Sequence, residues 1–297
     1  MNSPYVVRTR AEVHEQLAAP RATGQRVGLV PTMGAMHEGH ASLLRVARDR
    51  VGDGPVVASI FVNPLQFGAG EDLDRYPRTF EADLKVCERE GVDIVFAPEV
   101  DEVYPGGPAT EAAVTVEPGG LATVLEGRVR PGHFRGVLTV VAKLFGLVRP
   151  DLAVFGEKDY QQLVLIRRMV ADLCLGVEIV GGETERESDG LALSSRNAYL
   201  DEEWRPEAAV LNRSLRAAQR AAQHGLPAAL DAARAELRTS PKVDLDYLEV
   251  TTPDLDPLPE VPPPGTEARI LIAARVGTTR LIDNLPLVIG APARGGS

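Results

Sequence analysis

Short apolar runs alternate with longer amphipathic stretches through about the first 180 residues of the chain. Most of these runs are continuously apolar, which is typical of strands covered on both faces of a sheet. The stretches between them repeat their apolar positions every three or four residues, as helices do. This alternation predicts an α/β fold with a doubly wound parallel sheet. The predicted strands are residues 27–30, 56–62, 93–96, 153–155 and 177–180, and the predicted helices include residues 41–51, 80–89, 137–147 and 160–173.

The pattern changes after about residue 182. Two helices are predicted there, over residues 201–224 and 227–239, followed by strand-like runs at 245–250 and 269–274. A loop with six prolines separates the two runs, and so much proline excludes regular structure from it. We therefore expect two domains, residues 1–182 and a smaller α+β C-terminal domain over residues 183–297. The tail from residue 291 onward is expected to be disordered.

Composition narrows the class of protein. The chain has 297 residues, enough to bury a substantial core, and a formal net charge of −10, which argues against nucleic acid as a partner. No uncharged apolar run is long enough to span a bilayer, and no signal peptide is recognisable at the N-terminus. Cys87 and Cys174 are far apart and are expected to be buried thiols in a reducing compartment. We therefore expect a cytoplasmic protein that binds neither nucleic acid nor a membrane.

Polar residues cluster where three of the predicted strands end. The clusters are residues 31–40, 63–68 and 156–162. In an open parallel sheet, ligands bind beyond the carboxyl ends of the strands, so the three clusters are expected to serve one site.

The first cluster joins the glycines Gly34 and Gly39 to the histidines His37 and His40. Glycine lets the backbone approach a phosphate closely, and the free N–H groups at a helix start favour anions. Two imidazoles three residues apart can face the same anion. Taken alone, the pair could equally be two surface histidines or a metal pair. The spacing is not that of a zinc protease, and the chain has no ordinary P-loop motif.

The second cluster offers two carboxamides, Asn63 and Gln66, between apolar residues. A carboxamide both donates and accepts hydrogen bonds, which suits a hydroxy acid better than a hydrocarbon. For Asn63, the capping of a helix is an equally good interpretation.

The third cluster follows a strand and Gly156. Lys158 is well placed there to neutralise charge on a phosphate, and Gln162 falls one turn into the next helix. Asp159 would keep the lysine protonated or bind a ribose hydroxyl. The alternative is a solvated loop with a Lys–Asp pair.

Two further segments carry phosphate-binding side chains. Ser194, Ser195 and Arg196 form a compact hydroxyl and guanidinium group, although they could simply begin a helix. Arg130 lies in a basic loop over residues 128–136, for which a solvated loop is a plausible alternative.

In this order, the clusters resemble the pantothenate synthetase family, in the adenylate-forming branch of the nucleotidyltransferase superfamily. The resemblance covers nearly the whole chain except the proline-rich loop and the tail. One departure is Met36, where the family more often has leucine, and this is a packing change. The matching strings are residues 31–40, 61–68, 76–79, 130–137, 155–163, 189–200 and 274–285.

The resemblance implies a two-step ligation. ATP and pantoate give pantoyl adenylate and pyrophosphate, and β-alanine then gives pantothenate and AMP. It also implies a Rossmann-like N-terminal domain, a C-terminal lid, a homodimer, and Mg²⁺ accompanying ATP, whose protein ligands the sequence does not indicate.

The residue roles that the resemblance implies fall into three groups. His37 and His40 stabilise phosphate charge, with His40 as proton donor. The catalytic residues are His37, His40, Lys158 and Arg196. The ATP-binding residues are Met33, Gly34, His37, His40, Gly156, Lys158, Asp159, Ser194, Ser195 and Arg196. The substrate-binding residues are Gln66, Gln162, Asn63 and Arg130.

Two other functions are compatible with parts of this pattern. A cytidylyl- or adenylyltransferase that releases a stable nucleotide product would share the two-histidine turn, but it is not expected to carry the Gln66 and Gln162 pair. A nucleotide-binding regulator without catalysis should have lost His40, Lys158 or Arg196, and the chain keeps all three. The ligase is therefore the preferred interpretation.

Overall fold

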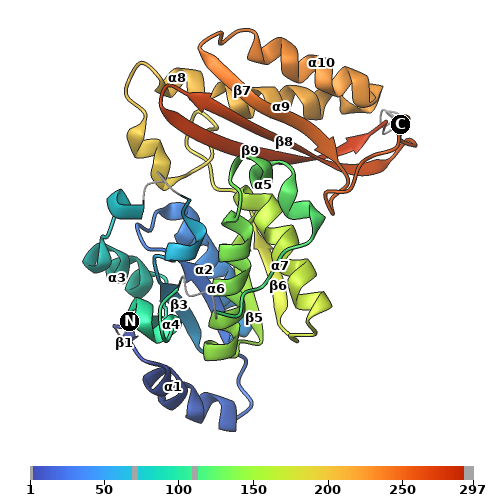
Figure 1. Cartoon of the computed structure of the whole chain (residues 1–297). Helices are drawn as coiled ribbons and strands as arrows, with labels where there is room; N and C mark the ends of the chain where they lie inside the picture. The colour runs from blue at the N-terminus through green and yellow to red at the C-terminus, as the bar shows by residue number, and fades with distance from the viewer. Residues whose placement is uncertain (1–2, 69–72, 109–112, 291–297) are drawn as a thin grey trace. The chain divides into compact units, whose positions relative to one another are not determined.

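The computed structural model describes residues 3–68, 73–108 and 113–290 (Figure 1). The tail from residue 291, which the sequence predicts to be disordered, lies outside the described residues. The chain divides into two compact units. The N-terminal unit comprises residues 1–157 and 161–183, and the C-terminal unit comprises residues 158–160 and 184–297.

In the described residues, a six-stranded parallel sheet forms the centre of the N-terminal unit, which confirms the predicted fold class. The five predicted strands are present, and the edge strand β1 was not predicted. The strand order is β1-β4-β3-β2-β5-β6. Strands β3 and β4 are added on one side of β2, and β5 and β6 on the other, so the order of strand addition reverses between β2 and β5. The strands are β1 (Tyr5–Val7), β2 (Gly28–Thr32), β3 (Val56–Ile60), β4 (Ile94–Phe96), β5 (Leu152–Gly156) and β6 (Glu178–Gly182).

Helices cover this sheet, and consecutive side chains of its central strands are buried, so both faces of the sheet are covered. Val30 and Ala58 form one buried apolar cluster with residues of α2 and α3. Leu29 and Val57, one position earlier in each strand, are also fully buried but lie outside this cluster. Helix α6 contacts both β2 and α1. The helices of this unit are α1 (Arg10–Ala22), α2 (Glu38–Val51), α3 (Phe80–Arg89), α4 (Val100–Val103), α5 (Glu126–Val129), α6 (His133–Val148) and α7 (Tyr160–Asp172).

Short 3₁₀ helices connect or extend the elements and carry several of the candidate residues. They include η1 (Pro64–Gln66), η2 (Leu73–Arg75), η3 (Gly120–Thr123), η4 (Glu157–Asp159) and η5 (Ser195–Tyr199).

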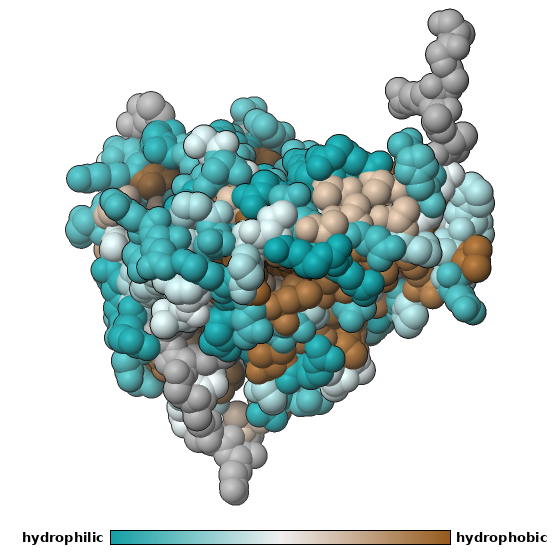
Figure 2. Space-filling view, turned by 90° about the horizontal axis from the view of Figure 1, so that it is seen from above, coloured by the Kyte–Doolittle hydropathy of each residue, from teal (hydrophilic) through white to brown (hydrophobic). Residues whose placement is uncertain are grey.

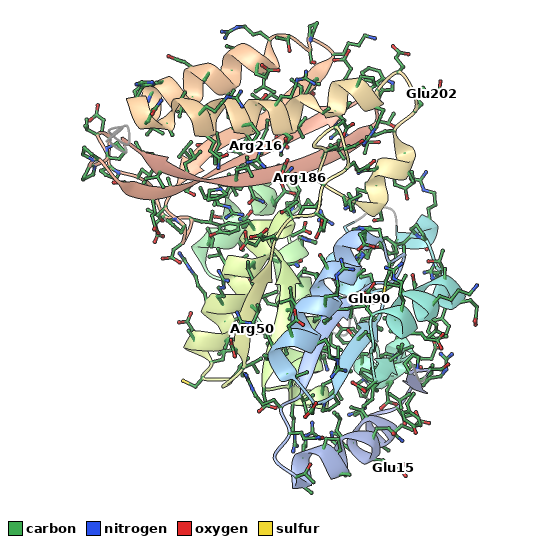
Figure 3. The ribbon with its side chains drawn as sticks, turned by 180° about the vertical axis from the view of Figure 1, so that it is seen from behind. Glu15, Arg50, Glu90, Arg186, Glu202 and Arg216 are labelled. Atoms are coloured by element: carbon green, nitrogen blue, oxygen red, sulfur yellow. The ribbon has the colours of Figure 1, made fainter. Side chains whose placement is uncertain are left out.

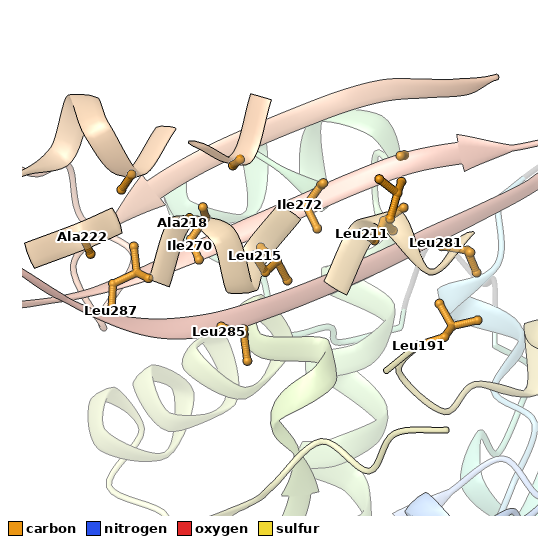
Figure 4. Close-up of a cluster of buried hydrophobic side chains, with 14 of the residues drawn as sticks. Leu191, Leu211, Leu215, Ala218, Ala222, Ile270, Ile272, Leu281, Leu285 and Leu287 are labelled. Carbon is orange, nitrogen blue, oxygen red and sulfur yellow. The ribbon is translucent and has the colours of Figure 1, made fainter. Parts of the chain in front are cut away.

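In the C-terminal unit, an antiparallel sheet in the order β7-β8-β9 carries helices α9 and α10 (Figure 1). One apolar core joins α9 to the sheet, with Leu211 and Leu215 of the helix against Ile270 and Ile272 of the central strand (Figure 4). The elements are α8 (Arg205–Ala208), α9 (Val210–Ala221), η6 (Ala222–His224), α10 (Leu226–Leu237), β7 (Val243–Thr251), β8 (Thr266–Val276) and β9 (Thr279–Ile289).

Two sequence-based expectations for this unit need correction. The helix predicted over residues 201–224 is instead α8, α9 and η6, and it begins only at Arg205, where Pro206, which lacks an N–H, is accommodated in the first turn of α8. Strand β9 was not predicted. Its polar residues Asp283 and Asn284 and the exposed Pro286 interrupt the apolar alternation, and proline is tolerated there because β9 is an edge strand.

The two cysteines also differ from expectation. Both are free thiols, but only Cys87 is buried, whereas Cys174 is exposed. Cys174 follows α7 with a positive φ of 52°, in the turn that ends the helix, where its side chain faces solvent.

Hydrophilic side chains cover most of the face seen in Figure 2, as the acidic composition leads one to expect. Within the described part of the chain, no helix combines the length and the apolar character needed to cross a membrane.

Candidate active site

The connection from β2 to α2, residues 32–40, is called the histidine turn below. It bends through two consecutive left-handed residues, Gly34 with φ 83° and Ala35 with φ 49°. At Gly34 a side chain is excluded by space as well as by φ, because a Cβ there would lie 2.9 Å from Oδ2 of Asp83. Thr32 supports the bend by accepting the Gly34 N–H at 3.1 Å and donating to the Ser59 carbonyl at 2.8 Å.

Asp83 of α3 holds the next two residues of the histidine turn. One carboxylate oxygen accepts the Ala35 N–H at 3.1 Å and the other accepts the Met36 N–H at 2.8 Å. The Thr79 hydroxyl donates to the same carboxylate at 3.2 Å. Asp83 is only 2% exposed, so these bonds replace its lost hydration. Asp83 was not predicted as a site residue, because an acid in an amphipathic helix normally faces solvent.

The two histidines lie side by side at the start of α2, with ring centroids 4.2 Å apart. Nδ1 of His37 accepts the Gly39 N–H at 3.1 Å, and Nδ1 of His40 accepts the His37 N–H at 3.3 Å. An imidazole nitrogen that accepts a hydrogen bond carries no proton, so each neutral ring has its proton on Nε2. The arrangement therefore makes both rings Nε2–H donors beside the first N–H groups of a helix, where an anion is favoured.

After β3, Asn63 begins η1 and Gln66 ends it. The Asn63 side chain caps the short helix by accepting the Leu65 N–H, so the capping interpretation is correct for its oxygen. Its nitrogen donates to Oε1 of Gln66 at 3.2 Å, and Nε2 of Gln66 lies 3.0 Å from Sδ of Met33. Three of the predicted site residues, Met33, Asn63 and Gln66, thus form one connected group.

Arg130 reaches the same group through a histidine. Its guanidinium lies 3.0 Å from Nε2 of His133, and Nδ1 of His133 lies 2.8 Å from the Gln66 carbonyl. Because a guanidinium only donates and a carbonyl only accepts, His133 carries its proton on Nδ1. His133 was not predicted as a site residue, although it lies within the basic loop over residues 128–136.

Gly156 and Gln162 flank the turn between β5 and α7. Gly156 ends β5, and a Cβ there would meet only a Leu43 methyl at an ordinary 3.8 Å. Within the described part of the chain, packing therefore sets no need for glycine at this position. Gln162 lies on α7 and is half-buried, whereas its neighbour Gln161 is buried and its amide is bonded to the backbone of Leu121, Val124 and Glu126. Gln161 is thus a structural residue.

Residues 158–160, called the Lys158 segment below, belong to the C-terminal unit although they lie between β5 and α7 in sequence. The Lys158 carbonyl accepts the side-chain N–H of Asn284 from β9 at 2.9 Å. Oδ1 of Asn284 accepts from Nε of Arg269 at 2.7 Å, and the Arg269 guanidinium stacks on Tyr160 at 3.9 Å from the ring centroid. The Lys158 ammonium itself lies 3.8 Å from the Asp159 carboxylate, which confirms the Lys–Asp pair.

Ser194, Ser195 and Arg196 begin η5. Ser194 caps this short helix by accepting the Arg196 N–H at 3.2 Å, so the capping interpretation applies to this serine. Nearby, Arg186 (labelled in Figure 3) forms a two-point ion pair with Asp283 of β9 at 2.7 and 2.9 Å and also donates to the Gly190 carbonyl. Strand β9 therefore anchors both the Lys158 segment and the chain leading to η5.

The predicted site residues thus fall into two sets, one in each unit. The N-terminal unit brings the histidines to the start of α2, with Gly34 in the histidine turn before them, and it connects Met33, Asn63, Gln66 and Arg130. Gly156 ends β5, and Gln162 lies on α7. The C-terminal unit contains the Lys158 segment and the Ser194–Arg196 group. No cluster of three or more His, Cys, Asp or Glu side chains suited to a metal occurs among the described residues.

One sequence family matches almost the whole chain. The sequence model described as Pantoate-beta-alanine ligase matches residues 5–286. A pantothenate synthetase of Nocardioides sp. (strain ATCC BAA-499 / JS614) is 70% identical over 99% of this chain and 89% of that protein. A pantothenate synthetase of Mycobacterium sp. (strain KMS) is 57% identical over 96% of this chain and 88% of that protein.

Solved structures agree with the sequence comparison. The crystal structure of pantothenate synthetase from Thermus thermophilus superimposes with a TM-score of 0.86 at 51% identity, covering 95% of this chain and 98% of that one. Pantoate-beta-alanine ligase from Francisella tularensis, complexed with beta-gamma ATP and beta-alanine, gives a TM-score of 0.75 at 32% identity, covering 95% and 97%.

Proposed function

The chain belongs to the pantoate-beta-alanine ligase family, and from this premise we propose that it joins pantoate to β-alanine through a pantoyl adenylate. In the first step a carboxylate oxygen of pantoate attacks the α-phosphorus of ATP, and pyrophosphate leaves. In the second step the β-alanine amine attacks the activated carbonyl carbon, and AMP leaves with the electrons of the broken carbon–oxygen bond. The amine loses its proton, so the products are pantothenate, AMP and pyrophosphate.

The observation that carries the proposal is the pair of Nε2–H groups at the start of α2. His37 and His40 present these donors where the helix also favours an anion, so phosphate charge that develops during adenylation is stabilised in place. His40 is proposed as the proton donor, on family resemblance. The sheet order supports a ligand site at the histidine turn. This turn follows β2, beside the point where the order of strand addition reverses, which is where open parallel sheets bind ligands.

The remaining ATP-binding roles follow the chemistry of the side chains. Lys158 and Arg196 supply positive charge to the phosphates, and the hydroxyls of Ser194 and Ser195 supply hydrogen bonds. Met33, Gly34, Gly156 and Asp159 complete the proposed nucleotide-binding set. Since packing among the described residues gives no reason for glycine at Gly156, a role in leaving room for a ligand is supported.

For the acid substrate, we propose Gln66 and Gln162 as the principal ligands and Arg130 and Asn63 as contributors. His133 links the Arg130 guanidinium to the Gln66 backbone carbonyl, which supports the place of Arg130 in this group. A guanidinium near an amide donor suits the carboxylate and hydroxyl oxygens of pantoate.

Magnesium is proposed to enter as part of the nucleotide substrate. Mg²⁺ commonly keeps several waters and is bound through substrate phosphates, so it does not require a cage of protein side chains.

The C-terminal unit is proposed to act as a lid during adenylate formation. A mixed anhydride is destroyed by water, so the reaction has to be shielded until β-alanine attacks. Residues 187–197 should therefore gain amide-exchange protection with saturating ATP, and unchanged protection would count against the lid. A homodimeric, cytoplasmic enzyme is part of the same proposal, on family resemblance, and sedimentation of the purified chain tests the dimer.

Product analysis tests the reaction. With ATP, pantoate and β-alanine, we expect AMP and pyrophosphate to form only when pantoate is present, and pantothenate to form only when β-alanine is also present. ADP and phosphate, or a stable nucleotide adduct as the final product, would contradict the ligation. In the same assay, Lys158→Ala should lower turnover by about a hundredfold or more with the fold intact, because it removes charge stabilisation from the transition state.

A further inference from the structure

The Asn63 amide has a fixed orientation. Its oxygen accepts the Leu65 backbone N–H at 3.3 Å, and its nitrogen donates to the Gly136 backbone carbonyl at 3.1 Å. A backbone N–H can only donate and a backbone carbonyl can only accept, so the two ends of the amide cannot be exchanged. The contact with α6 depends on glycine, because a Cβ on Gly136 would lie 2.2 Å from the Leu65 carbonyl oxygen.

Tyr104 completes the hydrogen bonding of Asn63. Its hydroxyl lies 2.7 Å from Oδ1 of Asn63, and because that oxygen only accepts, the hydroxyl has to donate. Tyr104 is 4% exposed, Asn63 is 1% exposed, and burial raises the pKa of the Tyr104 phenol well above its ordinary value. The phenol therefore remains a donor throughout the neutral and moderately alkaline range.

The orientation of Asn63 determines that of Gln66. Because Nδ2 of Asn63 donates to Oε1 of Gln66, the other end of the Gln66 amide, Nε2, is directed away from Asn63 and toward Sδ of Met33. A thioether sulfur is a weak acceptor, so an oxygen ligand would replace it readily. The three side chains thus form a chain of hydrogen bonds that begins at a buried phenol and ends at an N–H donor on a half-buried residue.

From this arrangement we propose that Tyr104 is a positioning residue, which acts through Asn63 to make Gln66 present an N–H donor to the acid substrate. Asn63 then serves the substrate through Gln66. The inference rests on the proposed function, since it assigns to Gln66 a ligand with carboxylate and hydroxyl oxygens. It adds a residue from α4's carboxyl end, Tyr104, to the determinants of substrate recognition.

Replacement of Tyr104 by phenylalanine removes one hydroxyl and keeps the ring. The ring packs near Phe61, with centroids 6.2 Å apart, and under the Lys143 ammonium at 5.1 Å, and both contacts should remain. We expect kcat/KM for pantoate to fall about fivefold, the effect of one lost neutral hydrogen bond, while the KM for ATP stays unchanged. Tyr247→Phe is the matched control, because Tyr247 is also a buried tyrosine but lies in β7, and it should change kcat/KM by less than about twofold.

A double-mutant cycle separates positioning from general stability. If Tyr104 acts through Gln66, Tyr104→Phe should change pantoate kinetics by less than about twofold in a Gln66→Ala background. The same fivefold loss in both backgrounds would overturn the proposal. Where Gln66→Ala turns over too slowly, pantoate binding by calorimetry with a non-hydrolysable ATP analogue gives the same cycle.

Gln66→Glu tests the donor directly if Tyr104→Phe does not fold. Glutamate keeps the acceptor toward Asn63 but replaces the N–H donor by an oxygen, so the KM for pantoate should rise by more than about thirtyfold. An unchanged KM would overturn the proposal.

Failure of the proposed function is distinguishable from failure of this inference. If the wild-type chain forms no pantothenate, the proposed function fails. The hydrogen-bond chain is then tested by the ¹⁵N-labelled side-chain amide resonances of Asn63 and Gln66. Both should shift in Tyr104→Phe, and a shift of neither would contradict the chain.

Discussion

The histidine turn and the Lys158 segment both lie after neighbouring strands of the parallel sheet, yet they are held in different ways. The histidine turn is fixed by a buried carboxylate, Asp83, which accepts the backbone N–H groups of the left-handed Ala35 and of Met36. The Lys158 segment is fixed by a neutral amide, Asn284, which donates to one backbone carbonyl. One anchor is an anion that accepts, and the other is an uncharged group that donates.

This difference shows how precisely each segment has to be placed. Two bonds to one charged group fix two successive peptide units, and the side chains of His37 and His40 follow directly from that backbone. In the Lys158 segment, the neutral Asn284 amide holds the Lys158 peptide and Arg269 holds the Tyr160 ring, and the long lysine side chain keeps several rotatable bonds. Short imidazoles therefore depend on backbone placement, whereas the lysine acts mainly as a point charge.

Asp83→Asn should give the largest effect and tests the charged anchor. The amide has only one oxygen, so its nitrogen would face the Ala35 or Met36 N–H, and one of the two bonds is lost. We expect kcat to fall about a hundredfold, because a shift of about 1 Å in catalytic groups has that effect, and the free energy of unfolding to fall by about 2 kcal/mol. Steady-state kinetics and urea unfolding measure the two quantities.

Thr79→Val is the matched control for Asp83. It removes the hydroxyl that donates to the carboxylate but keeps both backbone bonds, so kcat should stay within about threefold of wild type. An Asp83→Asn enzyme with normal kcat would show that the histidine turn holds its shape without the carboxylate.

Asn284→Ala should have a smaller effect and tests the neutral anchor. It removes the donor to the Lys158 carbonyl and the acceptor of Arg269, so we expect kcat to fall about tenfold. Asn284→Asp keeps the acceptor for Arg269 and loses only the donor. If the two variants lose similar activity, the Lys158 contact is responsible. Full activity in Asn284→Asp would assign the effect to Arg269.

The smallest effect is expected for Cys87, which reports on the histidine turn without taking part in the reaction. Its sulfur lies 3.8 Å from Sδ of Met36, and burial, with a smaller contribution from the Asp83 charge, raises the pKa of its thiol from 9.0 to about 12. In native protein at about pH 8, a thiol reagent should react with the exposed Cys174 and not with Cys87. Asp83→Asn should make Cys87 reactive, and Asn284→Ala should not.

The same thiol gives a pH dependence of stability. Above pH 9.0 the unfolded thiol loses its proton, whereas the folded thiol keeps it until about pH 12. The free energy of unfolding contributed by Cys87 is therefore fully present below pH 9.0 and decreases as the pH rises toward about 12. Cys87→Ala should flatten this part of the urea-midpoint profile, and an unchanged slope would contradict the assignment.

The sequence indicated the sheet because its strands are buried on both faces and so read as continuous apolar runs. It also indicated the histidine turn, because two glycines and two histidines at a strand end form a local pattern. Asp83 and Asn284 carried no such pattern. Each acts on a segment far away along the chain, 47 or 48 residues for Asp83 and 126 for Asn284, and only the folded structure brings donor and acceptor together. Tyr104 went unnoticed for the same reason, since it lies 41 residues from Asn63.

The assignment of residues 158–160 to the C-terminal unit has a consequence for the construction of chimeras between family members. With a single recombination point near residue 183, the Lys158 segment would come from one parent. The antiparallel sheet that holds it, with Asn284 and Arg269, would come from the other parent. Three crossovers are needed, before residue 158, after residue 160 and near residue 183, so that these three residues travel with residues 184–297. The C-terminal unit is thus discontinuous in sequence, and a domain boundary drawn at one position would leave out residues 158–160.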